Sequence, residues 1–327
     1  MTLVIALVAI ALIFDFLNGF RDSSSIVATL ISSRAYPPRL ALGVTAVAEF
    51  AGPFIFGVAV ARTIGEGIVA PGDVTVEMIL AALLSATGWN VLTWFLSIPS
   101  SSSHALVGGL IGAIAVGAGF QAIQLGGLEK VVIALFISPI LGLVVGYLFT
   151  KLVFFLARGA SPGINWFFKR SQLLTAIALA LSHGTNDAQK TMGIITLGLV
   201  ATGVLAEFQI PGWVIAASAA AIALGTALSG WRLIRTLGGK FYKIRPVHAF
   251  SSQVASAIVI LGASLLGGPV STTQVVSSAI MGVGSAERLS KVRWRVAVEI
   301  ALAWIVTIPA TALVAAGLYW VVEWVVG

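Results

Sequence analysis

Apolar runs of membrane-spanning length follow one another along almost the whole of this chain. Of its 327 residues, 58% are hydrophobic and only 9% are charged, whereas about a quarter of the residues in a soluble domain are charged. A fold in water has too little polar surface to cover so many apolar residues. The sequence therefore predicts an all-α polytopic membrane protein. The chain has no cysteine, which excludes disulfides and thiolate chemistry.

Basic residues gather in four of the loops between the apolar runs. They are Arg34 and Arg39; Arg158, Lys169 and Arg170; Arg232, Arg235, Lys240, Lys243 and Arg245; and Arg288, Lys291, Arg293 and Arg295. By the positive-inside rule, we expect these loops to be cytoplasmic and both termini to lie outside the cell membrane. The net charge of +7 is then explained by the membrane surface, and no nucleic-acid partner is expected.

This orientation constrains how individual segments cross the lipid bilayer. Residues 2–33 and 173–205 must cross once each, although a helix of this length measures about 48 Å and the hydrocarbon core about 30 Å. We expect such a segment to be tilted, broken, or folded on itself at its polar centre. Residues 75–119 and 246–285 must each begin and end on one side. Each forms either two full crossings or a re-entrant hairpin.

A polar motif with an aspartate occurs twice inside these apolar segments. Residues 16–33 read FLNGFRDSSSIVATLISS and contain Gly19 and Asp22. Residues 181–198 read LSHGTNDAQKTMGIITLG and contain Gly184 and Asp187 at the same spacing. Ionisable side chains are costly in hydrocarbon and are usually functional there. Duplicated half-chains with polar residues at matching places are typical of secondary transporters.

A second polar string is also duplicated, as PSSSSH at Pro99–His104 and PVSTTQ at Pro269–Gln274. The two strings are 170 positions apart, and the same offset relates Pro139 to Pro309. Shared apolar composition is the alternative explanation, but it does not account for Pro, Ser/Thr and Asp recurring in register. Because one half starts outside and the other inside, we predict two inverted-topology repeats that meet at the membrane midplane. Residues 1–157 form the first repeat, 158–172 a cytoplasmic linker, and 173–327 the second repeat.

Each Ser/Thr string predicts a helix N-terminus. Proline followed by serine or threonine favours a helix start at about Ser102 or Ser103, with unpaired N–H groups and the positive end of the helix dipole facing the hydroxyls. Two such N-termini at the midplane would bind a small oxyanion. The candidate residues are Ser101, Ser102, Ser103, Ser271, Thr272 and Thr273. The alternative is that these hydroxyls only bond to helix carbonyls or ease close packing.

The buried acids would repel an anion unless cations accompany it. Carboxylate and carbonyl oxygens suit a hard cation, so we predict a Na⁺ site. Its candidate ligands are Asp22, Asp187, Asn186 and Glu49. The alternative is that Arg21 and Lys190 neutralise the aspartates in structural salt bridges. Ser25, Gln189 and Lys190 are further candidates for contact with the anion, and His104 and His183 are interpreted mainly as hydrogen-bonding packing residues.

At these residues the chain resembles the inorganic phosphate transporter (PiT) family. That family has a duplicated G-x-N-D-x-x-N-like signature followed by P-x-S-x-T-H-like strings. The matching residues are Gly184, Asn186 and Asp187 in the second copy, Gly19 and Asp22 in the first, the paired serines Ser101 and Ser271, and the acid Glu49. The departures are Arg21, Ser25 and Lys190 at Asn positions, and Gln274 at the second histidine.

The resemblance implies phosphate symport driven by Na⁺ or H⁺, with an inverted-repeat fold and alternating access. From the spacings alone only a small oxyanion is predicted, and phosphate rather than sulfate comes from the resemblance. Na⁺ is favoured because hydroxyl and carbonyl oxygens cluster around the acids. Alternatives are a proton-coupled phosphate or sulfate symporter and an anion channel. No enzymatic activity is expected, since the protease signatures GxGD and GxSG are absent. Glycine-rich faces allow tight packing within the chain or in a homodimer.

Overall fold

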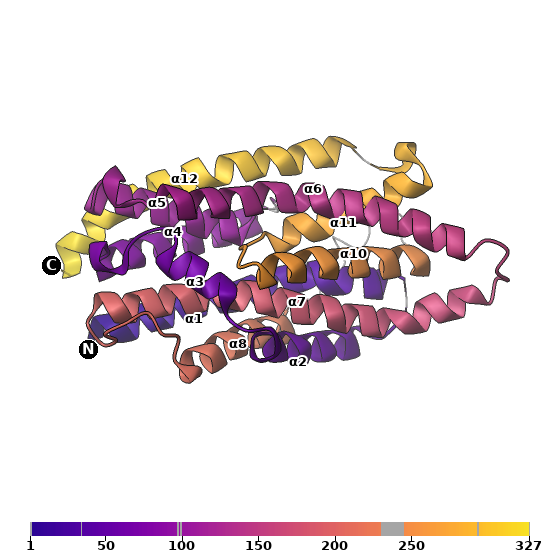
Figure 1. The fold of residues 1–327 in the computed structure, drawn as a ribbon, viewed down its shortest axis with the longest axis horizontal. Helices are drawn as coiled ribbons and strands as arrows, with labels where there is room; N and C mark the ends of the chain where they lie inside the picture. Colours follow the sequence, from indigo (N-terminus) through magenta and orange to yellow (C-terminus); the bar gives the residue numbers. More distant parts are fainter. Residues whose placement is uncertain are drawn as a thin grey trace.

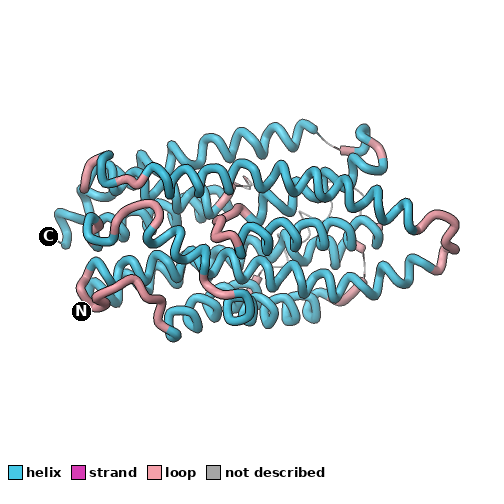
Figure 2. Tube along the Cα trace, in the orientation of Figure 1, coloured by secondary structure: helices cyan, strands magenta, loops and turns pink. Residues whose placement is uncertain are grey.

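The computed structural model describes residues 2–33, 35–96, 98, 100–229, 245–292 and 294–326. Helices account for nearly all of this part of the chain, with loops joining them (Figure 2). The predicted all-α membrane fold is confirmed, and six of the described helices are long and apolar enough to cross a membrane. Several residues of the sequence argument fall outside the described ranges: Arg34, Pro99, Arg232, Arg235, Lys240, Lys243 and Arg293.

The helices of the first half are α1 (Thr2–Ser32), α2 (Pro38–Phe56), α3 (Ala59–Glu66), α4 (Val76–Phe95), α5 (Ser102–Gly117) and α6 (Leu125–Leu156). Those of the second half are α7 (Ile164–Ala201), α8 (Gly212–Ala227), α10 (Pro246–Leu265), α11 (Thr272–Glu287) and α12 (Trp294–Val326). Short 3₁₀ turns cover Pro71–Asp73, Phe120–Ala122 and Leu289–Lys291.

The helix bounds repeat with the offset seen in the sequence. Adding 170 to residues 76 and 95 of α4 gives 246 and 265, the bounds of α10, and the bounds of α5 and α11 are related in the same way. Prolines occur at matching positions inside α6 and α12. The duplication therefore covers whole helices as well as short motifs.

Helices α1 and α7 are continuous through their polar centres, so the broken and folded alternatives for these segments are wrong. The physical reason is that neither helix contains proline, and polar side chains leave the backbone hydrogen bonds of a helix intact. Helix α7 also begins at Ile164, inside the predicted 158–172 linker. Hydropathy marks the end of an apolar run, whereas the helix continues beyond it into a polar segment.

The α4–α5 and α10–α11 pairs are hairpins whose tips meet inside the bundle. They enter from opposite ends of the long axis (Figure 1). Ser103 Oγ of the first tip donates a hydrogen bond to the carbonyl oxygen of Val270 in the second at 2.9 Å. The 16 residues of α5 span only about 24 Å, less than the hydrocarbon core of about 30 Å. The geometry therefore favours re-entrant hairpins over two full crossings.

The two sequence repeats interleave in space. Helix α1 packs mainly on α8, and α7 packs on α2. The α4–α5 hairpin lies against α12, and the α10–α11 hairpin lies against α6 (Figure 1). Each half therefore supplies the packing surface of the other, and the repeats are not two separate bodies.

Glycines at the crossings allow these close contacts. A Cβ added at Gly19 would lie 2.1 Å from the carbonyl oxygen of Ile222, and one at Gly225 would lie 2.1 Å from that of Phe16, so α1 and α8 approach backbone to backbone. A Cβ at Gly184 would lie 2.2 Å from the carbonyl oxygen of Glu49, which places α7 equally close to α2. The signature glycines are thus needed for helix packing.

We expect Gly225→Ala to destabilise the protein by about 2 kcal/mol, because the added methyl group meets backbone that can move only with its helix. Gly43→Ala is the matched control, since no atom lies within 4 Å of a Cβ there. Alanine at that helical position should be neutral or slightly stabilising. Thermal unfolding of both variants in detergent checks this, and equal midpoints would contradict the close α1–α8 contact.

Candidate functional site

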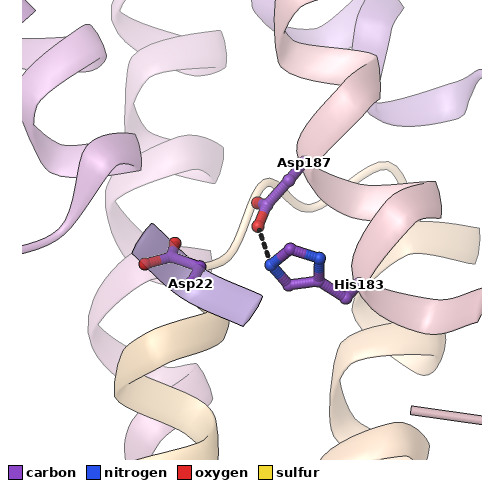
Figure 3. Close-up of side chains that lie close together, drawn as sticks. All are labelled: Asp22, His183 and Asp187. Atoms are coloured by element: carbon purple, nitrogen blue, oxygen red, sulfur yellow. Dashed lines mark ion pairs between the residues drawn. The ribbon is translucent and has the colours of Figure 1, made fainter. Parts of the chain in front are cut away.

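The centre of the bundle contains a buried group of two aspartates and a histidine. Asp22 comes from α1, and His183 and Asp187 come from α7 (Figure 3). One ligand atom of each lies within 4.8 Å of the others. Their exposed fractions are 4%, 1% and 1%. The structure thus brings together the two aspartates of the duplicated motif, which lie 165 positions apart in the sequence.

His183 lies between two carboxylates. Its Nδ1 is 2.8 Å from Glu49 Oε1, and its Nε2 is 2.9 Å from Asp187 Oδ2. A neutral imidazole has only one N–H group, so this triad holds an extra proton on the ring or on a carboxyl group if both contacts are hydrogen bonds. The packing role expected for His183 is therefore too narrow. Its spacing of four residues from Asp187, on one helical face, is the sequence signal for this pair.

Lys190 is fully buried and bound by oxygen atoms. Its Nζ donates hydrogen bonds to Ser103 Oγ at 2.6 Å and to the carbonyl oxygen of Val270 at 2.8 Å, and it forms an ion pair with Asp187 Oδ1. Thr272 Oγ1 donates to Asp187 Oδ2 at 2.7 Å. Both oxygens of Asp187 are therefore engaged, and the predicted alternative of an Asp187–Lys190 salt bridge is confirmed.

Asp22 has no such partner. Among the described residues, no ion pair involves its carboxylate, although Thr273 of α11 lies close enough to interact with it. The neighbouring Arg21 points elsewhere, with Nη1 donating to Asn90 Oδ1 at 2.6 Å and Nη2 to the carbonyl oxygen of Ser100 at 2.8 Å. The alternative of a structural Asp22–Arg21 salt bridge is therefore wrong, because the guanidinium is used by the α4–α5 tip.

The helix N-termini predicted from the Ser/Thr strings are confirmed. Helix α5 begins at Ser102, and its N-cap Ser101 accepts a hydrogen bond from the backbone N–H of His104 at 3.2 Å. Helix α11 begins at Thr272, after Ser271. The remaining N–H groups of each first turn have no partner within the helix. The positive end of the α11 dipole lies beside Asp187 through Thr272, and that of α5 lies beside Lys190 through Ser103.

Asn186 holds the second hairpin in place. Its Nδ2 donates to Ser264 Oγ at 2.8 Å, and its Oδ1 accepts from the backbone N–H of Val270 at 3.1 Å. Asn186 is the repeat counterpart of Arg21, which binds the first tip. Arginine in the first copy and asparagine in the second thus perform the same task. The structure gives the amide of Asn186 protein partners on both sides, so we do not place a cation there.

The side-chain amide of Gln189 is bound by backbone away from the tips of α5 and α11. Gln189 Oε1 accepts from the backbone N–H of Val60 at 2.7 Å, and its Nε2 donates to the carbonyl oxygen of Gly57 at 2.5 Å. Its amide therefore joins α2 to the start of α3. Ser25 is half-buried on α1, one turn beyond Asp22. The contact of Ser25 with the anion stays a prediction.

Asp15 and Asn18 are buried polar residues that the sequence argument does not single out. Both lie on α1, with exposed fractions of 0% and 1%. The available signal is the same as for Asp22, an acid within an apolar run. It is hidden in the opening segment MTLVIALVAIALIFDFL, which otherwise reads as an ordinary hydrophobic helix.

Membrane-length helices, paired hairpins that meet inside the bundle, and a buried ionisable cluster at their tips are typical of a membrane transporter. The chain belongs to the phosphate transporter family, which it matches over residues 18–315. The resemblance expected from the sequence is thus confirmed.

Individual relatives agree with this family. The chain is 44% identical to a probable low-affinity inorganic phosphate transporter of Rhizobium meliloti (strain 1021), over 98% of this chain and 97% of that protein. It is 42% identical to one of Bacillus subtilis (strain 168), with the same coverage. A solved structure described as the sodium-dependent phosphate transporter superposes with a TM-score of 0.90 at 26% identity, covering 100% of both chains. These relatives are transporters and not enzymes.

Proposed function

We propose that this protein imports inorganic phosphate together with a cation, Na⁺ in preference to H⁺, by alternating access. Phosphate is the substrate in the names of the family and its relatives, and sodium dependence is in the name of the solved structure. The observation that carries the proposal is the combination of anion donors with three buried carboxylates at one point of the bundle.

The charges of the pocket require a cation partner. The ionisable groups in contact at its centre are the buried Asp22, Glu49, Asp187, Lys190 and His183, and the half-buried Arg21 lies next to them. Even with His183 protonated, the three positive groups only balance the three carboxylates. Nothing then neutralises a phosphate ion with one or two negative charges in a poorly screened interior. An accompanying cation removes this cost.

Asp22 is the proposed ligand of that cation. It is the carboxylate of the cluster without an ion-pair partner, and the Thr273 hydroxyl beside it adds a second hard oxygen ligand. Asp187 differs, because the ammonium group of Lys190 already occupies its Oδ1. We therefore assign Lys190 the role of a fixed positive charge on the Asp187 side, where Ser103 connects it to the α5 terminus.

The phosphate is proposed to bind between the two hairpin tips. Its donors would be the N–H groups and hydroxyls of the two N-terminal turns, Ser101, Ser102, Ser103, Ser271, Thr272 and Thr273. The hydroxyls of Ser103 and Thr272 would first turn away from Val270 and Asp187, to which they donate in this structure. Helix N-termini bind phosphate through unpaired N–H groups and the dipole, and the two here face each other across the tip contact.

Alternating access is supported by the arrangement of repeat counterparts. Asp22 lies beside Asp187, and His104 Nδ1 lies 3.3 Å from Gln274 Nε2, its counterpart at an offset of 170. Counterparts touch only near the axis that relates two repeats. An inverted relationship places this axis in the membrane plane, and switching the conformations of the halves would then expose the site to either side. The basic loops are proposed to be cytoplasmic, with both termini outside.

A homodimer stays a proposal, and its interface would have to be a surface other than the glycine-rich face of α5. The glycine face of α5 is used within the chain: a Cβ at Gly108 would meet the Ile308 carbonyl oxygen at 2.5 Å, and one at Gly112 would meet that of Ala312 at 2.0 Å.

Purified protein in liposomes should accumulate phosphate above its external concentration when an inward Na⁺ gradient is imposed, and should fail to do so when K⁺ replaces Na⁺ at fixed pH. An inward proton gradient is the second arm, since the Glu49–His183–Asp187 triad favours H⁺ as the alternative coupling ion. Accumulation of phosphate under the proton gradient alone would identify H⁺ as the coupling ion. Equilibration without accumulation under either gradient would indicate an anion channel and contradict the proposal.

A further inference from the structure

A second buried acid lies on α1, two helical turns before Asp22. Asp15 has an exposed fraction of 0%, and neither of its carboxylate oxygens makes a hydrogen bond of ordinary length and geometry with the described residues. It lies near Asp187, Lys190 and His183 without belonging to their contact network. Asp15 and Asp22 are about 10 Å apart along the helix axis, which is too far for one ion to contact both.

Two further polar side chains near Asp15 are also buried and also lack a hydrogen bond of ordinary geometry with the described residues. Thr191 of α7 is the hydroxyl that faces Asp15, and Asn18 lies one turn along α1. Their exposed fractions are 0% and 1%. Thr191 Oγ1 and both amide atoms of Asn18 also make no hydrogen bond of ordinary geometry.

The packing of α1 on α7 explains why these residues meet. A Cβ at Gly198 of α7 would lie 2.4 Å from Leu7 of α1, while Asp187 lies beside Asp22. The two helices are therefore antiparallel here, and Asp15 and Thr191 fall at matching heights between those two contacts. The residues Asp15, Asn18 and Asp22 are spaced by three and four positions, which places them on one face of α1.

Buried polar atoms are nearly always paired, so oxygen atoms buried together without hydrogen bonds of ordinary geometry are candidates for ligands of an ion. A fully buried carboxylate is strongly disfavoured without a proton or a cation beside it. Here the carboxylate is accompanied by an amide oxygen and a hydroxyl oxygen, which are the ligand types of a hard cation.

We infer that Asp15, Asn18 and Thr191 form a second cation site, for Na⁺, separate from the one at Asp22. It lies at the α1–α7 interface, closer along α1 than Asp22 to the start of that helix. The N-terminus lies at one end of the bundle (Figure 1). The inference rests on the proposed sodium-coupled function, because it supplies a second binding position for the same ion.

Binding of radioactive ²²Na⁺ to the purified full chain tests this inference. Wild-type protein should bind two Na⁺ ions per chain, and Asp15→Asn should bind one. Asp22→Asn should lose the other. Asp73→Asn, at an exposed position, is the matched control and should bind two. Thr191→Val keeps the shape of its side chain and should weaken one of the two sites at least about fivefold, which provides a test if Asp15→Asn fails to fold.

Two outcomes separate this inference from the proposed function. If Asp15→Asn and Thr191→Val both bind Na⁺ as wild type does, while Asp22→Asn loses a site, then Asp15 carries a proton and the inference alone is overturned. If the wild type binds no Na⁺ and its phosphate uptake is insensitive to Na⁺, the sodium coupling fails and this inference fails with it.

Discussion

Replacing Asp22 with asparagine is expected to reduce cation-driven phosphate uptake at least about 100-fold, equivalent to about 2.7 kcal/mol. Asparagine has nearly the same shape, so the packing of α1 should survive. The variant lacks the one carboxylate of the central cluster without an ion-pair partner, and the cation then loses its charged ligand. Initial rates of ³²P-phosphate uptake into liposomes under an inward Na⁺ gradient measure this effect.

The control for this experiment is Asp73→Asn, which makes the same chemical change at an exposed position and should leave uptake at the wild-type rate. Thermal unfolding of the Asp22→Asn protein establishes that it is folded. A folded Asp22→Asn protein that keeps both its rate and its Na⁺ dependence would remove Asp22 from the proposed cation site.

Replacing Lys190 with methionine should have the second large effect, on stability as well as on transport. The ammonium group is buried and forms an ion pair with Asp187, so its loss leaves this buried carboxylate with His183 as its one remaining ion-pair partner among the described residues. Breaking a buried pair in this way costs about 3–5 kcal/mol. Methionine retains the length and apolar stem of lysine, so the change is confined to the charge.

The double variant Lys190→Met with Asp187→Asn separates the two effects. Removing the carboxylate as well should restore much of the lost stability, since no unpaired charge remains, while uptake should stay low because the site lacks both groups. Unfolding midpoints and uptake rates of the two single variants and the double variant form a double-mutant cycle. Additive losses of stability would contradict a direct buried interaction between Lys190 and Asp187.

The sequence predicts those features of the fold that depend on local pattern. The hydrophobic runs give the membrane helices, and the proline followed by serines gives the start of α5 at Ser102. The charges of the loops give only the sides on which segments end. They do not show whether the α4–α5 segment crosses the membrane twice or forms a re-entrant hairpin. The hydrogen bond between Ser103 and Val270 shows that the tips of the two hairpins meet, which favours the re-entrant hairpin.

The interleaving of the repeats was not predictable, because no local pattern shows that α1 packs on α8 or that α4–α5 packs on α12. The partners of the side chains next to Asp187 were not predictable for the same reason, because they come from helices distant in the sequence. Successive helical residues point about 100° apart, so Asn186 reaches the α10–α11 tip and Gln189 reaches the start of α3. Proximity in sequence suggested a shared site for them, whereas their directions depend on helices that are distant in the sequence.

Mutual dependence of phosphate and cation binding tests the central claim most directly. Titration calorimetry on the purified protein gives the phosphate Kd in Na⁺ and in equimolar K⁺ at one pH, and the Na⁺ Kd with and without phosphate. If both ions share the pocket at Asp22 and the hairpin tips, each should tighten the binding of the other by the same factor, at least about tenfold. A phosphate Kd that is the same in Na⁺ and K⁺, and at acidic and neutral pH, would contradict this account.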